Sequence, residues 1–162
     1  MSSDFQGFTV VITGAGSGIG LAVAKKLKAQ GAHIFGLDLN AGELDGVGTW
    51  IECDIGSDES VTKAFASIAD KVTKIDVLIN NAGIGAQGGV EAATTEEWNK
   101  VLNINVIGTS RVSAAALPLL RKSADAAIVN TCSVVATVGL PKRAIYSASK
   151  GAILSLTLAM AA

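Results

Sequence analysis

The sequence predicts an α/β fold, a doubly wound parallel sheet of about five strands with helices on both faces. Five short apolar runs alternate along the chain with longer segments of helical periodicity. Apolar runs of this kind are typical of parallel strands that are buried on both faces. The length of 162 residues suits one hydrophobic core, so we expect a single domain over residues 1–162. In such a sheet the ligand crevice lies at the carboxyl ends of the strands.

The expected strands are short and rich in β-branched residues, which favour extended backbone. They lie at residues 8–12, 34–38, 50–54, 77–80 and 126–130. The first expected helix covers residues 19–30 and ends before Gly31, a usual residue at a helix C-terminus. The second begins at Ser57 or Asp58 and runs to about residue 72, and the third begins at Thr94 or Thr95 and runs to about residue 120. The last helix begins near Ala144.

The composition excludes several classes of partner. Thirteen basic and 14 acidic side chains give a net charge of -1, so no basic field is present to attract nucleic acid or a membrane surface. Two cysteines, Cys53 and Cys132, are too few for a disulfide scaffold or a metal site, and we expect both to pack as small apolar residues. The N-terminus lacks the order of a signal peptide, and the uncharged tail over residues 151–162 is short for a membrane span. We therefore expect a cytoplasmic protein.

A glycine-rich turn joins the first strand to the first helix. Its sequence is Thr13-Gly14-Ala15-Gly16-Ser17-Gly18-Ile19-Gly20. A diphosphate needs backbone N–H groups at a helix N-terminus and no Cβ atoms in its path, and both conditions are met here. The turn is not a P-loop, and its spacing differs from Gly-x-Gly-x-x-Gly because positions 19 and 21 are Ile and Leu. The alternative is an ordinary flexible connection between strand and helix.

An aspartate follows at the end of the second expected strand. Asp38 lies 24 residues after Gly14, where a carboxylate can accept hydrogen bonds from an adenosine ribose and repel a 2′-phosphate. Leu39 and Asn40 follow it, and Ser17 occupies the turn position where an arginine would hold that phosphate. The sequence therefore favours NAD over NADP as the cofactor, with a solvent-facing turn aspartate as the alternative. Asp54, at the end of the third strand, is equally consistent with a cofactor contact and with a turn.

The sole tyrosine precedes a lysine by four residues on the last expected helix. This spacing places Tyr146 and Lys150 on one helix face. A free phenol titrates near pH 10, and about 4 kcal/mol is needed to bring this to pH 7. An ammonium about 4 Å away supplies an energy of that order at an effective dielectric constant of about 20. The pair is therefore a candidate proton-transfer site, the alternative being a half-buried tyrosine beside a solvated lysine.

Together these residues resemble the short-chain dehydrogenase/reductases. The motifs are Thr13-Gly14-(x)3-Gly18-Ile19-Gly20, then Asn80-Asn81-Ala82-Gly83, then Ser133 thirteen residues before Tyr146-(x)3-Lys150. Asn105, 28 residues before Ser133, matches the helix asparagine of that family. The resemblance covers essentially the whole chain. It implies a Rossmann-like NAD(P)-binding domain and an NAD-dependent oxidoreductase that interconverts a secondary alcohol and a ketone on the CH–OH group of the donor.

The resemblance also implies a role for each matching residue. Tyr146 is the expected general acid/base, and Lys150 is expected to hold the nicotinamide ribose beside it. Ser133 is expected to hydrogen-bond the substrate oxygen, and Asn105 to support a water that relays protons from Lys150. No metal is expected. The full set of expected cofactor-binding residues is Gly14, Ser17, Gly18, Ile19, Gly20, Asp38, Leu39, Asp54, Ile55, Asn81, Ala82, Gly83, Tyr146 and Lys150.

Family members normally continue with further strands and a substrate lid, so the resemblance implies a C-terminally incomplete chain. The implied partners are a small alcohol or ketone and further copies of the chain in a dimer or tetramer. The segments 84–89 and 134–140 are mainly small and apolar, which admits a modest alcohol, a sugar derivative or a flat hydrophobic molecule. A function of another class is a non-catalytic NAD-binding or redox-sensing module, which predicts cofactor binding without turnover.

Overall fold

A computed structural model describes residues 4–162 and contains one five-stranded parallel sheet. The first three residues of the expected domain, and most of the N-terminal segment considered for a signal peptide, lie outside the described residues. The strand order is β3-β2-β1-β4-β5. The strands are β1 (Thr9–Thr13), β2 (His33–Asp38), β3 (Thr49–Glu52), β4 (Val77–Asn80) and β5 (Ala127–Asn130). The order reverses between β1 and β4, so this arrangement confirms the predicted doubly wound α/β fold and places a switch point beside the glycine turn.

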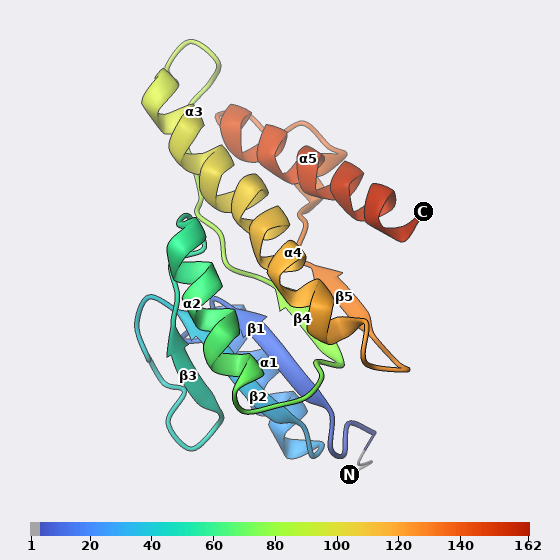
Figure 1. Cartoon of the computed structure of the whole chain (residues 1–162). Helices are drawn as coiled ribbons and strands as arrows, with labels where there is room; N and C mark the ends of the chain where they lie inside the picture. The colour runs from blue at the N-terminus through green and yellow to red at the C-terminus, as the bar shows by residue number, and fades with distance from the viewer. Residues whose placement is uncertain (1–3) are drawn as a thin grey trace.

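Helices cover both faces of the sheet (Figure 1). α1 (Gly18–Ala29) lies behind the sheet in that view, and α2 (Asp58–Ala69) and α4 (Thr109–Leu120) lie in front of it. α3 (Thr95–Leu102) continues through a π-helix, Asn103–Gly108, directly into α4. After β5, a short 3₁₀ turn at Val134–Ala136 leads to α5 (Ala144–Ala161), which packs along α3 and the π-helix.

Side-chain caps fix two of the helix starts. The Ser57 hydroxyl accepts a hydrogen bond from the Ser60 amide at the start of α2. At the start of α3, Thr94 and Glu97 form a reciprocal capping box. β3 ends at Glu52, two residues earlier than predicted, and the backbone N–H of Asp54 donates to the Ser60 hydroxyl at 2.9 Å. The third strand therefore turns into the α2 cap instead of continuing along β2.

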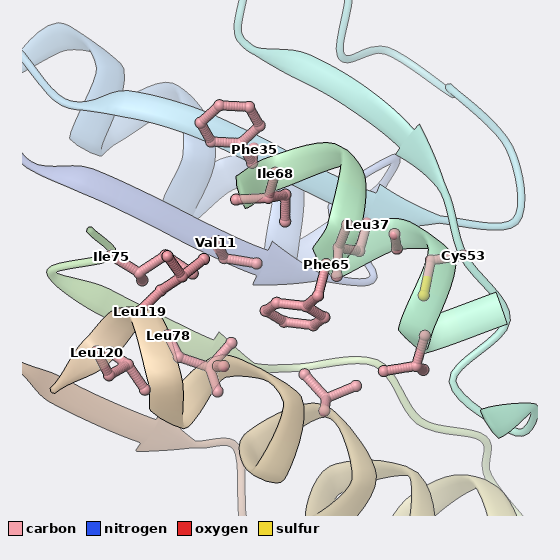
Figure 2. Close-up of a cluster of buried hydrophobic side chains, with 14 of the residues drawn as sticks. Val11, Phe35, Leu37, Cys53, Phe65, Ile68, Ile75, Leu78, Leu119 and Leu120 are labelled. Atoms are coloured by element: carbon pink, nitrogen blue, oxygen red, sulfur yellow. The ribbon is translucent and has the colours of Figure 1, made fainter. Parts of the chain in front are cut away.

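The larger hydrophobic core lies between the sheet and the pair α2 and α4 (Figure 2). Strand side chains such as Val11 and Leu78 pack there against Phe65 and Ile68 of α2. Cys53 is 3% exposed in the same cluster, and burial raises the pKa of its thiol to about 11. This confirms that Cys53 packs as an apolar residue. A second core, on the other face, packs α1 against the sheet.

A buried carboxylate ties the amino end of β4 to its neighbours. Asp76 is 0% exposed, and its Oδ2 accepts the Thr9 backbone N–H at 2.8 Å. Its Oδ1 accepts the Lys74 ammonium at 2.6 Å and the Ser123 hydroxyl at 2.5 Å. Burial alone would raise the pKa of this carboxyl, but the three hydrogen bonds hold the pKa below its ordinary value. The network joins the start of β1 to the turn before β5.

The last helix is the one described helix that is long and apolar enough to cross a membrane, judged by length and composition alone. Its mean hydropathy over 18 residues is 1.3. The same helix carries Ser149 and Lys150, both buried against the rest of the fold. Thr157 accepts a hydrogen bond from Asn130 of β5 at 2.9 Å. A polar contact thus joins α5 to the last strand of the sheet.

Candidate active site

The glycine turn leaves the N-terminus of α1 open. Ser17 is the N-cap residue, but its side chain makes no cap hydrogen bond, and no acidic residue lies in the first turn of the helix. Gly18 has φ +54°, and no atom lies within 4 Å of the position that a Cβ would occupy. The first backbone N–H groups of α1 are thus left for an anionic ligand, which the helix dipole also favours.

Two further glycines allow close approach of backbone segments. A Cβ on Gly20 would lie 2.1 Å from the carbonyl oxygen of Gly14. A Cβ on Gly16 would lie 2.8 Å from the carbonyl oxygen of Asn40. These contacts are too short for any side chain, so the turn requires glycine at both positions. The turn is compact and fixed by its neighbours, which differs from a flexible connection.

The Asp38 carboxylate lies against the glycine turn. Its Oδ2 accepts the Gly16 backbone N–H at 2.9 Å, and its Oδ1 accepts the Asn40 N–H at 3.4 Å. A carboxylate offers about four acceptor positions, so two remain for a ligand. Trp50 Nε1 donates to the Asp38 carbonyl oxygen at 3.2 Å and fixes the end of β2. The carboxylate is half-buried and held in one orientation at the carboxyl edge of the sheet.

A cleft of about 380 Å³ runs along this edge. Its lining includes eleven of the expected cofactor-binding residues: Gly14, Ser17, Gly18, Ile19, Asp38, Leu39, Asp54, Ile55, Asn81, Ala82 and Gly83. Gly20 is expected in the same set, but it is buried beneath the turn and acts through the close approach described above. Asp54 lines the cleft while its Oδ1 accepts the Gly56 N–H at 2.8 Å, so it is a turn residue and a cleft residue at once.

The segment after β4 is anchored to β1 by one threonine. Thr13 Oγ1 accepts the backbone N–H groups of Asn81 and Ala82, both at 3.0 Å. The Asn81 amide donates to the carbonyl oxygens of Thr13 at 3.1 Å and Gly14 at 3.3 Å. These contacts hold one wall of the cleft against the glycine turn. Asn81 is consequently more than a turn former.

A second cleft, of about 520 Å³, continues from the first. Both clefts are lined by Ile19, Asn81, Gly83 and Ile84. The second one adds Ser133, Tyr146 and Lys150 to its walls. The structure therefore brings three of the four expected catalytic residues to the mouth of the glycine turn. They come from the end of β5 and the start of α5, which are distant from the turn in the sequence.

The lysine and the tyrosine lie together on α5 as the spacing predicts. Lys150 Nζ is 5.7 Å from the centre of the Tyr146 ring, and it donates to the Thr131 carbonyl oxygen at 2.8 Å. Lys150 is 7% exposed, and burial lowers the pKa of its ammonium, with the nearby Cys132 thiol acting in the opposite direction. The lysine is thus a buried cation beside a phenol, which differs from the alternative of a solvated lysine.

Asn105 lies behind this cleft and lines neither cavity. It is 2% exposed, and its Oδ1 accepts the Ile84 N–H at 2.8 Å while its Nδ2 donates to the Ile84 carbonyl oxygen at 2.9 Å. The same Nδ2 donates to the Ser149 hydroxyl at 3.1 Å, and that hydroxyl donates to the Tyr146 carbonyl oxygen at 2.8 Å. The π-helix presents Asn105 to α5, and π-helical segments are frequent at functional sites. In this structure the asparagine joins the 84–89 segment to the tyrosine helix.

Ser133 caps the 3₁₀ turn after β5. Its Oγ accepts the Val135 N–H at 3.4 Å, so the hydroxyl proton is left to donate toward the cleft. The preceding Cys132 is half-buried, and its Sγ lies 3.3 Å from the Lys150 carbonyl oxygen. Both cysteines are unpaired, and among residues 4–162 there is no group of histidine, cysteine and acidic side chains that could hold a metal ion.

Sequence reasoning missed four residues that shape the site. One is Thr13, which holds Asn81. Another is Ser149, which holds Asn105. Lys150 is held by Thr131, and the fourth residue, Arg143, lines the second cleft. Because Thr13 and Ser149 lie inside the quoted motifs, the motifs could have indicated them as site residues. Thr131 acts through its backbone carbonyl, for which residue type gives no signal.

The short-chain dehydrogenase family model matches residues 8–162. The chain belongs to this family. As a short-chain dehydrogenase it shares 35% identity with 2-(S)-hydroxypropyl-CoM dehydrogenase 3 of Xanthobacter autotrophicus, over 100% of this chain and 68% of that protein. It shares 36% identity with meso-2,3-butanediol dehydrogenase of Serratia marcescens, over 97% of this chain and 65% of that protein.

Solved structures of other dehydrogenases superpose closely. The aldohexose dehydrogenase of Thermoplasma acidophilum gives a TM-score of 0.92 at 32% identity, over 99% of this chain and 62% of that one. An NAD⁺-bound xylitol dehydrogenase gives a TM-score of 0.87 at 36% identity, over 95% of this chain and 64% of that one. The chain therefore spans about two thirds of the length of these relatives.

Proposed function

We propose that the protein is an NAD(H)-dependent oxidoreductase that interconverts a secondary alcohol and a ketone. The observation that carries the proposal is the buried Lys150 ammonium 5.7 Å from the centre of the Tyr146 ring, in a cleft that continues into the glycine-turn cleft. A nicotinamide cofactor supplies the hydride chemistry in enzymes of this family, and the open helix N-terminus, the glycines and the cleft lining suit its diphosphate and adenosine.

In this proposal Tyr146 transfers the proton of the substrate hydroxyl, in either direction. Lys150 places positive charge beside the phenol and stabilises negative charge that develops on the reacting oxygens during that transfer. The Ser133 hydroxyl donates to the substrate oxygen and stabilises charge that develops there. Asn105 positions the tyrosine helix through Ser149, and the proton relay from Lys150 that the family resemblance implies for Asn105 stays part of the proposal.

The test is the substitution Tyr146→Phe, which removes the hydroxyl and keeps the ring. We expect turnover of a panel of secondary alcohols with NAD to fall at least about 100-fold, because a positioned general acid/base contributes roughly 10²–10⁴. Binding of NADH, followed by its fluorescence, should stay near the wild-type value. Unchanged turnover in the variant rules out the tyrosine mechanism. Cofactor binding by the wild type without turnover of any alcohol or ketone favours the non-catalytic NAD-binding module instead.

We infer NAD rather than NADP from Asp38. Its carboxylate is held at the cleft wall with acceptor positions to spare, which suits a ribose and opposes a 2′-phosphate. The substitution Asp38→Ala should raise kcat/KM with NADP relative to NAD. An unchanged ratio between the two cofactors contradicts this role for Asp38.

We also propose that the protein is cytoplasmic and forms a homodimer or homotetramer. The outward residues Leu154, Leu158 and Met160 of α5 are apolar and exposed, which supports burial against another copy. Light scattering of the purified protein tests this, and a monomer over the micromolar range contradicts it.

A further inference from the structure

A second cation faces the cleft beside Tyr146. Arg143 occupies the N-cap position of α5, three residues before Tyr146, and lines the cleft together with Ser133 and Leu140. Three residues correspond to nearly one helical turn, or about 4.5 Å along the axis. Arg143 is half-buried and borders the same cleft as Tyr146. The proposed hydride and proton chemistry gives it no task.

No acidic side chain within residues 4–162 forms an ion pair with this guanidinium. Arg143 and Lys150 are the charged residues that line the cleft, and no acidic side chain lines it. Arg143 takes part in none of the ion pairs formed by residues 4–162, and the first turn of α5 contains no acidic residue. A guanidinium has five N–H donors, of which one goes to the Ala86 carbonyl oxygen at 3.1 Å. Most of its donor capacity remains available.

The remaining wall of the cleft is apolar. Val134 is 71% exposed and Leu140 is 53% exposed, and Ile84 lines the same space. A cleft with a proton-transfer pair, an apolar wall and an unpaired guanidinium suits a molecule with a carbinol, a short hydrocarbon body and an anionic end. Guanidinium and carboxylate groups match in geometry and form strong charge-assisted hydrogen bonds.

We propose that Arg143 binds the carboxylate of the substrate, so that the substrate is a small hydroxy acid and the product the corresponding keto acid. This rests on the proposed oxidoreductase function and specifies its substrate class. Arg143 also has a structural contact, because its hydrogen bond to Ala86 joins the 84–89 segment to the start of α5. Backbone hydrogen bonds of Gly88 with Lys142 and Ala144 join the same two segments. A purely structural clamp and a carboxylate ligand predict different substrate dependence.

The experiment compares kcat/KM for 3-hydroxybutyrate with that for neutral 2-butanol in wild type, Arg143→Gln and Arg143→Lys. Glutamine keeps a donor for Ala86 and removes the charge, and lysine keeps the charge and removes the planar fork. We expect wild type to prefer the acid, and Arg143→Gln to lower the acid-to-alcohol ratio roughly 10- to 100-fold, the loss expected for one charge-assisted hydrogen bond. Arg143→Lys should fall between the two. The control Arg121→Gln removes an exposed guanidinium outside this cleft and should leave the ratio unchanged.

Three results overturn the proposal: no preference for the acid in wild type, an equal loss with both substrates in Arg143→Gln, or a loss of NADH affinity in that variant. The last result would place the guanidinium on the cofactor. Calorimetric binding of acetoacetate and of 2-butanone to the NADH-saturated protein gives a readout without turnover. If the protein turns over no substrate but binds acetoacetate in a way that depends on Arg143, the carboxylate site is supported and the oxidoreductase function is contradicted. Acetoacetate binding that is equal in wild type and Arg143→Gln contradicts the site whether or not turnover is seen.

Discussion

Two glycines inside helices should respond to alanine in opposite directions. Gly20 lies in α1 and Gly151 lies in α5. Helix propensity alone predicts that alanine stabilises each position by roughly 0.5–1 kcal/mol. At Gly151 no atom lies within 4 Å of the added Cβ, so we expect that gain in the free energy of unfolding. Gly151→Ala is therefore the matched control.

At Gly20 the added Cβ meets the glycine turn. It would lie 2.1 Å from the Gly14 carbonyl oxygen and 2.8 Å from Asn81 Nδ2, whereas carbon atoms in contact with other heavy atoms prefer about 3.5 Å or more. The Gly14 carbonyl must move by about 1.4 Å to restore a 3.5 Å contact, and such overpacking costs about 1–3 kcal/mol. After the gain of roughly 0.5–1 kcal/mol from propensity, we expect a net loss of up to roughly 2.5 kcal/mol. If the turn binds the cofactor diphosphate as proposed, NADH affinity should also fall because the turn is displaced.

Urea unfolding followed by far-UV circular dichroism measures both effects, and NADH fluorescence measures binding. The unfolding midpoint should rise for Gly151→Ala and fall for Gly20→Ala. Equal stabilisation by both substitutions would refute the close approach of α1 to the turn. A destabilised Gly20→Ala with wild-type NADH affinity would refute the placement of the cofactor on this turn.

Three further substitutions probe buried polar groups. Asp76→Asn leaves an amide facing one of three donors and should lower the free energy of unfolding at pH 7 by about 2–4 kcal/mol. Because the folded pKa of Asp76 is lowered, its stabilising effect is present above pH about 4 and is lost as the pH falls further. The stability difference between variant and wild type, measured by urea titration, should therefore shrink in acid. Ser149→Ala leaves one Asn105 N–H without its acceptor and should lower the free energy of unfolding by about 1–3 kcal/mol without changing NADH affinity. An unchanged urea unfolding midpoint contradicts that contact. Because burial lowers the pKa of Lys150, wild-type stability should rise with pH from the folded pKa up to about 10.4, and Lys150→Met should lack this rise in pH-dependent unfolding.

The sequence predicted the sheet well where apolar runs have sharp ends. β4 has the predicted bounds, and the other strands lie within two residues of theirs. The glycine turn, Asp38 and the pair Tyr146 and Lys150 lie where expected relative to β1, β2 and α5, because each position depends on a local spacing to a strand or a helix; their roles stay predictions. Tertiary contacts decided the rest. β3 stops early because Asp54 bonds to the α2 cap, which no pattern within the strand reveals.

The π-helix was not predicted, because apolar residues continue through residues 94–120 as they would in one α-helix. What distinguishes it is the set of contacts that Asn105 makes with Ile84 and Ser149, from segments far away in the sequence. The orientation of Arg143 is likewise a tertiary result. Its sequence neighbours Lys142 and Pro141 suggest a surface turn, yet Arg143 lines the cleft and its side chain donates to the Ala86 carbonyl oxygen.

The π-helix has a consequence for how this chain tolerates insertions and deletions. Each residue of an α-helix advances about 100° around the axis. A π-helix bonds residue i to i+5 and so holds about one more residue per turn than an α-helix. Removing one residue between Asn103 and Gly108 would therefore let the segment close into an α-helix, with the fully buried Val112 and Ala116 still facing the sheet. The direction of Asn105 toward Ile84 and Ser149 would change instead. A shortening at this place would thus spare the hydrophobic interior and disturb the link between the 84–89 segment and α5.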